Sequence, residues 1–298
     1  MNADLFSLPL EDGRSLDVAV AGSDGDTPLV FHHGTPASRV LFEPMVETAV
    51  AHGLRFVTYS RPGYGGSSRV EGRSVGDCAA DAARIVDHLG GGRFFTAGWS
   101  GGGPHALACA ALLPERVIAC STIAGVAPYE AAGLDWLAGM GNENIEEFGA
   151  AIEGPEALRV LLERDAPELV EVTPDQIADA LGDLIPDVDR ASLTGAFAAF
   201  MADGVHEALR SGSWGWFDDD VAFVHLWGFD LSDIRSPVTV WQGAQDRMVP
   251  FAHGEWLAAH IPAASAQLFE GEGHLSLIVG SFGDIVDDLI EAGTGGNA

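Results

Sequence analysis

Residues 94–104, with the sequence FFTAGWSGGGP, constrain the fold of this chain more than any other stretch. A short apolar strand runs into a G-x-S-x-G turn centred on Ser100, and a helix pattern follows from Pro104 to about Leu113. In such a strand–turn–helix unit the serine projects above the edge of a sheet, and the flanking glycines remove Cβ atoms that would collide. The helix N-terminus also favours developing negative charge. The pattern predicts that Ser100 is a nucleophile.

A second G-x-S-x-G match, at residues 72–76, has a different context. No apolar strand precedes Ser74, and a helix pattern follows from Cys78 to Leu89. Asp77 lies three residues after the serine, which is typical of a capping box at a helix start. We therefore interpret Ser74 as a helix N-cap and not as a nucleophile.

Strand and helix patterns alternate along most of the chain. Alternation of this kind predicts right-handed crossovers and an α/β fold with a mostly parallel, doubly wound sheet of eight strands. The expected strands cover residues 5–10, 15–21, 28–32, 54–60, 94–97, 117–124, 238–242 and 266–269. The expected helices end at about residue 52 or cover residues 75–89, 104–113, 251–260 and 283–290.

The segment 128–233 breaks this alternation, because it holds helix patterns and no convincing pair of strands. We predict a core domain made of residues 1–127 and 234–298, with 128–233 inserted as a helical cap, or lid. Aromatic residues gather in the second half of this insertion. They either pack the insertion onto the core or line an apolar substrate pocket over Ser100. The candidates for such a pocket are Trp99, Trp214 and Trp227.

The charge balance is strongly acidic, with 44 acidic residues against 15 basic ones and a formal net charge of −29. All the basic residues are arginine. Repulsion from phosphates and anionic headgroups argues against nucleic acid and membranes as partners. The balance suits a neutral or cationic small molecule, and adaptation to high salt is a second interpretation of it.

No apolar run approaches the length of about eighteen residues that a membrane span needs, and no basic segment followed by an apolar stretch opens the chain. The three cysteines, Cys78, Cys109 and Cys120, fall in apolar patterns without metal-ligand spacing. We expect them to be reduced core residues of a cytoplasmic protein. We expect no metal and no cofactor, and the sequence leaves the oligomeric state open.

A serine hydroxyl needs a base, and the base needs an orienting carboxylate. Two strands near the C-terminus supply both groups, because Asp246 follows the strand 238–242 and His274 follows the strand 266–269. Residues just past the carboxyl ends of parallel strands converge on one crevice. We predict His274 as the base and Asp246 as the orienting acid, with Glu130 as the main alternative to Asp246.

Catalysis at a carbonyl also requires N–H donors for the oxygen that becomes negative. The residue after the nucleophile, Gly101, offers one backbone N–H. The loop after the strand 28–32 offers the other, at Thr35. We predict that these two groups form the oxyanion hole.

Five segments, in order and at plausible spacing, resemble the α/β-hydrolase superfamily with a helical cap. They are His33-Gly34, Arg61-Pro62-Gly63-Tyr64-Gly65, Gly98-Trp99-Ser100-Gly101-Gly102, Gly243-Ala244-Gln245-Asp246 and Gly271-Glu272-Gly273-His274. The serine distinguishes the chain from the epoxide hydrolases and haloalkane dehalogenases that it otherwise looks like, since those use aspartate. The layout is also similar to proline iminopeptidases, which hold a substrate amine with acidic cap residues, although their His-Gly-Gly-Pro-Gly and Gly-Gly-Ser-Trp-Gly forms are missing here.

The resemblance implies a serine hydrolase that cleaves a small ester through an acyl-enzyme intermediate. Three other functions remain open on the same fold. They are an aminopeptidase or amidase of the proline iminopeptidase type, a ligand receptor without turnover, and a cofactor-free haloperoxidase or lyase.

Overall fold

One sheet of eight strands, in the order β1-β2-β4-β3-β5-β6-β7-β8, forms the centre of the computed structural model, which describes residues 3–295. β1 pairs with β2 and β2 with β4 in antiparallel fashion, and all other neighbours are parallel. The predicted mostly parallel sheet is confirmed. The strands are β1 Ala3–Pro9, β2 Ser15–Ala21, β3 Thr27–His32, β4 Leu54–Tyr59, β5 Phe94–Trp99, β6 Val117–Ile123, β7 Val238–Gly243 and β8 Ser265–Phe269.

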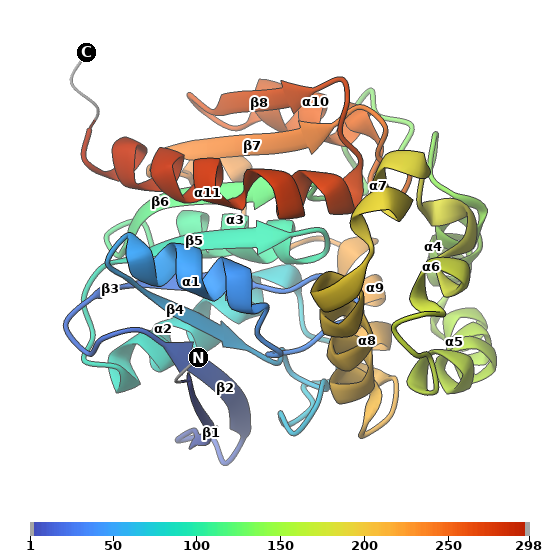
Figure 1. Cartoon of the computed structure of the whole chain (residues 1–298), viewed down its shortest axis with the longest axis horizontal. Helices are drawn as coiled ribbons and strands as arrows, with labels where there is room; N and C mark the ends of the chain where they lie inside the picture. Colours follow the sequence, from blue (N-terminus) through green and yellow to red (C-terminus); the bar gives the residue numbers. More distant parts are fainter. Residues whose placement is uncertain (1–2, 296–298) are drawn as a thin grey trace.

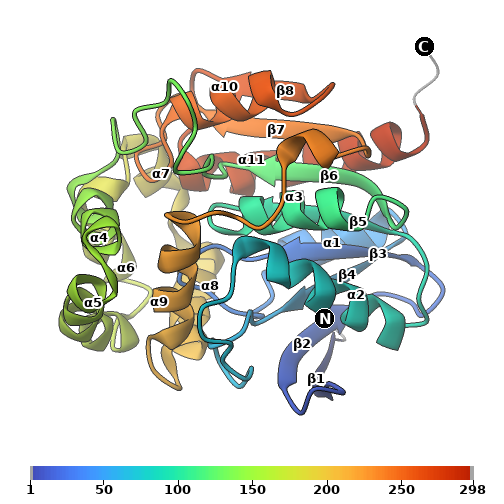
Figure 2. The same ribbon diagram turned by 180° about the vertical axis from the view of Figure 1, so that it is seen from behind.

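Helices cover both faces of the sheet, as Figures 1 and 2 show. On one face lie α1 (Glu43–Ala51) and α11 (His274–Gly293), and on the other lie α2 (Cys78–His88), α3 (Gly102–Leu112) and α10 (Phe251–His260). Each face has its own cluster of buried apolar side chains. The sheet is therefore doubly wound, as predicted.

The burial of individual elements follows from their sequence patterns. Every residue of β4, β5 and β7 is buried, as expected for parallel strands covered on both faces. In α2 the buried residues Ala82, Ile85 and Val86 recur at helical spacing, so one stripe of the helix faces the sheet.

Within the described residues, the segment between β6 and β7 contains helices joined by loops and no strand (Figure 1). They lie beyond the carboxyl ends of the parallel strands, where a cap over a site at that edge would sit. The limits of the predicted cap domain, residues 128 and 233, stay a prediction. The α-helices of this segment are α4 Asn142–Glu153, α5 Pro155–Val170, α6 Ile177–Ala180, α7 Asp187–Ser192, α8 Gly195–Leu209 and α9 Trp214–Phe223.

Three local features test the expectations about helix starts. The 3-10 helix η1 (Val75–Asp77) follows Ser74, whose backbone N–H donates to the Asp77 carboxylate at 2.7 Å, so the N-cap interpretation is confirmed. The helix expected after residue 36 begins only at Glu43, where Pro44 occupies the first turn. The last helix, α11, begins at His274, nine residues before the expected start. The carboxylate of Asp189, far away in the sequence, accepts the N–H groups of its first turn.

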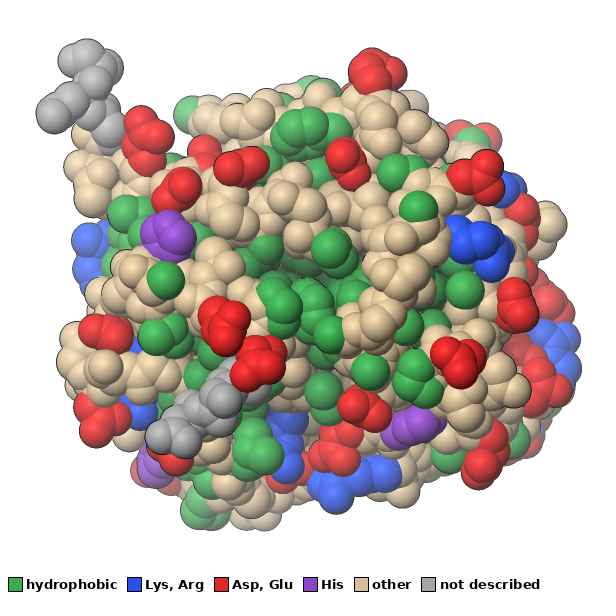
Figure 3. Space-filling view, viewed as in Figure 1, with side chains coloured by type: hydrophobic (Ala, Val, Ile, Leu, Met, Phe, Trp, Pro, Cys, Tyr) green, Lys and Arg blue, Asp and Glu red, His purple; other side chains and the backbone are tan. Residues whose placement is uncertain are grey.

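The three cysteines are free and buried, as predicted. Acidic side chains are scattered over the face shown in Figure 3, and arginines are fewer. Within residues 3–295, no helix combines the length and the apolar character that a membrane span requires.

Candidate active site

Ser100 lies in a sharp turn between β5 and α3. Its φ of +56° is in the left-handed region, which a residue with a side chain seldom adopts. The turn is so tight that a Cβ on Gly98 would lie 2.0 Å from the Gly102 oxygen, and a Cβ on Gly102 would lie 2.0 Å from the His32 oxygen. The Ser100 backbone N–H donates to the Ile123 oxygen of β6 at 2.9 Å. Glycine is therefore required on both sides, and the serine is held in a strained conformation.

His274 and Asp246 form a buried pair at the same edge of the sheet. His274 is the first residue of α11, and Asp246 lies in the loop after β7. The imidazole Nδ1 lies 2.8 Å from Asp246 Oδ2, and Asp246 Oδ1 accepts the backbone N–H groups of Met248 and Val249, both at 2.8 Å. Because an ionised carboxylate can only accept hydrogen bonds, Nδ1 of the neutral ring carries the proton that it donates to Asp246. Nε2 is then unprotonated and can act as a base.

The surroundings of His274 favour its protonated form. Burial by itself lowers the pKa of this imidazole, but the charge of Asp246, its hydrogen bond and the charge of Asp189 together outweigh burial, so the pKa is raised. A raised pKa suits a base that must accept a proton from a hydroxyl.

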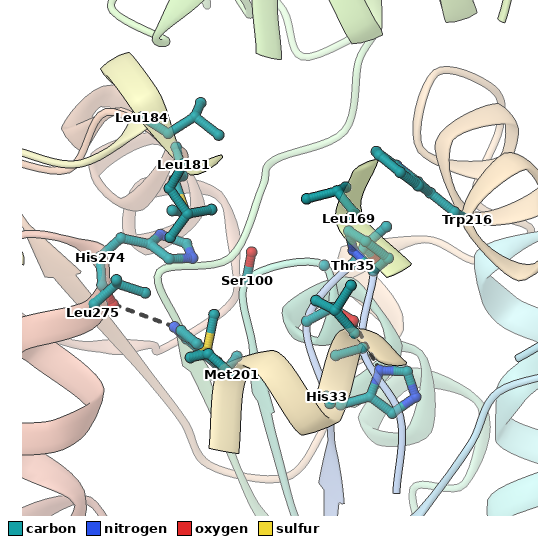
Figure 4. Close-up of a pocket in the computed structure, with 18 of the residues that line it drawn as sticks. His33, Thr35, Ser100, Leu169, Leu181, Leu184, Met201, Trp216, His274 and Leu275 are labelled. Carbon is teal, nitrogen blue, oxygen red and sulfur yellow. Dashed lines mark hydrogen bonds between the residues drawn. The ribbon is translucent and has the colours of Figure 1, made fainter. Parts of the chain in front are cut away.

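Ser100 and His274 line one cavity of about 410 Å³ between the sheet edge and the helices that connect β6 to β7. Figure 4 shows Ser100 between His274 and Thr35. Within residues 3–295, no hydrogen bond joins the Ser100 hydroxyl to the His274 ring. In proteins without bound substrate such hydrogen bonds are often long. The two side chains therefore line the same cavity without a hydrogen bond between them, and their catalytic roles stay predictions.

The predicted oxyanion donors also face this cavity. Thr35 and Gly101 both line it, and among the described residues neither backbone N–H has a hydrogen-bond acceptor. The two residues are packed together, because a Cβ on Gly101 would lie 2.4 Å from the Thr35 Oγ1. Two free N–H groups beside the serine can bind an oxygen that becomes negative.

A buried ionic cluster fixes the loop that carries Thr35. The Thr35 hydroxyl donates to the Asp219 carboxylate of α9 at 2.8 Å. Asp219 also accepts from Arg61, Arg73 and the Tyr64 hydroxyl, at 2.6, 2.6 and 2.8 Å. Burial would raise the pKa of Asp219, but the charges of Arg61 and Arg73 hold it well below its usual range. The cluster therefore joins α9 to the loops beside Ser100.

The cavity wall is largely apolar. Trp99 lines it, and so do Leu169, Leu181 and Met201, which Figure 4 labels. Carboxylates that also line it come from α4 and α5: Glu143, Glu146, Glu147, Asp165 and Glu168. Burial raises the pKa of Glu147 to about 7, against the opposing effect of a hydrogen bond from Trp216.

Two of the predicted pocket residues, Trp214 and Trp227, do not line this cavity. Trp214 is half exposed, with the Arg69 guanidinium 3.9 Å from the centre of its ring. Trp227 is buried and lines a separate depression together with Tyr129 and Trp256. The alternative orienting acid, Glu130, is exposed and lines that same depression. Trp216, on the buried side of α9, lines the cavity instead.

One residue near the site that the sequence patterns did not predict is Asp189, a buried residue of α7. Its carboxylate accepts the backbone N–H groups at the start of α11. No local pattern could have identified it, because its partners lie more than 80 residues further along the chain.

A strained serine between a strand and a helix, facing a histidine–carboxylate pair at the carboxyl edge of a doubly wound sheet, defines the α/β-hydrolase class. The family described as "alpha/beta hydrolase fold" matches residues 27–150. A non-heme chloroperoxidase of Streptomyces lividans is 27% identical over 90% of this chain and 92% of its own length.

Solved structures give the same fold. A bromoperoxidase from Bacillus anthracis covers 97% of this chain and 100% of its own, with a TM-score of 0.70 and 21% identity. An esterase from Exiguobacterium antarcticum covers 97% and 98%, with a TM-score of 0.64 and 20% identity. Residues 27–150 thus match the α/β-hydrolase family, and the whole chain has the α/β-hydrolase fold.

Proposed function

We propose that this chain is a serine hydrolase that cleaves a small carboxylic ester. Ser100 is the nucleophile, His274 the general base and Asp246 the orienting acid. The observation that carries the proposal is the hydrogen-bonded His274–Asp246 pair at a cavity that the strained Ser100 also lines.

The first half-reaction forms an acyl-enzyme. Nε2 of His274 accepts the Ser100 hydroxyl proton while the oxygen attacks the ester carbonyl. The backbone N–H groups of Thr35 and Gly101 stabilise the negative oxygen of the tetrahedral intermediate. The imidazolium then gives its proton to the leaving alkoxide, and the alcohol departs. Asp246 holds the ring in the required tautomer and stabilises its charge throughout.

The second half-reaction uses water as the nucleophile. His274 accepts a proton from water as it attacks the acyl group, and then returns a proton to the Ser100 oxygen. The products are a carboxylic acid and the free enzyme. No metal or cofactor is needed for any of these steps.

The cavity favours a substrate of modest size with an apolar acyl group. Its volume is about 410 Å³, and side chains such as Leu169 and Met201 provide much of its wall. We propose a small-molecule ester as the partner, and neither nucleic acid nor a membrane. The cytoplasmic location stays a prediction.

Replacement of the serine tests the proposal. We expect Ser100→Ala to lower hydrolysis of p-nitrophenyl butyrate by at least about 10³-fold, because the nucleophile is lost. A fluorophosphonate should label the unmodified protein and not the variant. Ser74→Ala, at the other G-x-S-x-G match, is the matched control and should retain turnover. Full turnover by Ser100→Ala would overturn the proposal.

A second candidate function rests on the chloroperoxidase and bromoperoxidase relatives. If hydrogen peroxide replaces water, the acyl-enzyme releases a peroxyacid and the free serine. The peroxyacid then oxidises bromide to hypobromous acid and leaves the carboxylate. Bromination of monochlorodimedone that requires acetate, peroxide and Ser100 would support this activity. Rapid ester hydrolysis in the absence of this bromination would favour the esterase function.

A further inference from the structure

The first turn of α11 is supported by a carboxylate that comes from α7. Asp189 is completely buried, and it accepts the backbone N–H groups of His274, Leu275 and Ser276, each at 2.8 Å. These are N–H groups for which a helix has no internal acceptor. One carboxylate therefore satisfies three donors, one of which belongs to the predicted base.

The chain around Gly273 leaves room for this carboxylate. A Cβ on Gly273 would lie 2.5 Å from each of the two Asp189 oxygens, so a larger residue would displace the acid or the backbone. The Gly273 N–H donates to the Ser276 hydroxyl at 2.8 Å, which closes the turn on the other side. The approach of α7 to α11 thus depends on glycine immediately before the histidine.

We propose that Asp189 is a positioning residue that holds the backbone of His274 and thereby sets the imidazole relative to Ser100. This inference rests on the proposed function. It makes the helical segment between β6 and β7 part of the catalytic apparatus, because α7 carries the residue that anchors the base. A displacement of the base of about 1 Å can cost about 10²-fold in rate.

Charge adds to this geometric role. The titratable groups whose charges act on the His274 ring are Asp246, from the loop after β7, and Asp189, from α7. From β5, Trp99 contributes only a neutral indole N–H, which donates to the His274 carbonyl oxygen at 3.3 Å. Because both carboxylates favour the imidazolium, loss of the Asp189 charge should lower the pKa of His274.

Asp189→Asn tests the inference, with Asp187→Asn as the matched control on the exposed side of the same helix. The amide can accept with one oxygen only, so at least one of the three N–H groups loses its partner. We expect a fall in kcat of about 10- to 100-fold with little change in KM. The acid limb of the kcat/KM profile should move to lower pH, and an NMR titration should show a lower pKa for His274.

A second variant approaches the same contact from the other side. Gly273→Ala keeps the charge but forces Asp189 and α11 apart, so kcat should again fall. In the double variant Gly273→Ala, Asp189→Ala the clash is relieved. Its loss of kcat should therefore be smaller than the combined losses of the single variants Gly273→Ala and Asp189→Ala. Circular dichroism and urea unfolding show whether each variant is folded.

The outcomes separate this inference from the proposed function. If folded Asp189→Asn keeps the kcat, the pH profile and the His274 titration of the unmodified protein, Asp189 is not a positioning residue, whatever the reaction. If Ser100→Ala retains turnover, the proposed function fails, while the His274 titration in Asp189→Asn still measures the coupling between α7 and the histidine.

Discussion

At the scale of single residues, the histidine–carboxylate pair has a defined proton arrangement. Asp246 accepts two backbone N–H groups through Oδ1 and faces the His274 Nδ1 through Oδ2. An asparagine here would keep the first set of bonds and turn its NH2 group toward Nδ1. The ring would then carry its proton on Nε2, where it cannot accept one from Ser100.

Asp246→Asn should therefore lower kcat of p-nitrophenyl ester hydrolysis by about 10³- to 10⁴-fold while the fold is kept. The pKa of His274 should fall as well, since its main stabilising charge is gone. Steady-state kinetics and an NMR titration of His274 check both expectations. Asp284→Asn, an exposed position on α11, is the control. Near-normal kcat in Asp246→Asn would show that another group orients the base.

At the scale of elements, the ionic cluster around Asp219 joins α9 to the core. Asp219 lies on α9, whereas Arg61 and Arg73 lie in loops of the core, and all three side chains are buried. A buried pair need not stabilise a fold relative to apolar packing, but removal of one partner leaves the other charge buried and unpaired. The same cluster holds Thr35, so stability and the oxyanion site depend on one carboxylate.

Asp219→Asn should lower the free energy of unfolding by about 3–5 kcal/mol. The pKa of Asp219 is depressed in the folded state. The Asp219 carboxylate therefore contributes to the free energy of unfolding above pH 3.8, its ordinary pKa, and this contribution is lost as the pH falls further. The difference from the unmodified protein should be constant between about pH 5 and 8 and shrink in acid. Urea unfolding at several pH values measures it, with exposed Asp203→Asn as control. Equal stability of Asp219→Asn and the unmodified protein at pH 7 would contradict the expectation.

Local patterns predicted the elements that position the candidate site, and long-range packing explains which residues near it they missed. Ser100 was recognisable because the strand, the turn and the helix are adjacent in sequence, and Asp246 and His274 because each follows a strand near the C-terminus. Asp189 contacts residues more than 80 positions away, and it resembles any other acid on a short helix. Trp214 and Trp227 lie away from the cavity, and aromatic content alone does not tell which way a side chain faces.

At the scale of the whole molecule, the formal charge of −29 is the dominant property. Acidic side chains spread over the visible face in Figure 3, with few arginines among them. Like charges repel one another more in the compact state than in the expanded chain, so the charge should reduce stability at low ionic strength. Salt screens this repulsion over roughly 10 Å at 0.1 M and less at higher concentration.

The midpoint temperature of unfolding should therefore rise, by several degrees, between about 0.02 and 1 M KCl at pH 7, since screening relieves repulsion among the surplus carboxylates. Differential scanning calorimetry measures this rise, and NaCl at equal ionic strength should give nearly the same curve. A nonionic osmolyte of equal osmolality separates screening from preferential exclusion. At pH 4.5, where part of the carboxylates is protonated, the dependence on salt should weaken. A midpoint that is flat or falls with salt would mean that attractive exposed pairs, such as that of Arg159 and Glu156, outweigh the repulsion of the surface.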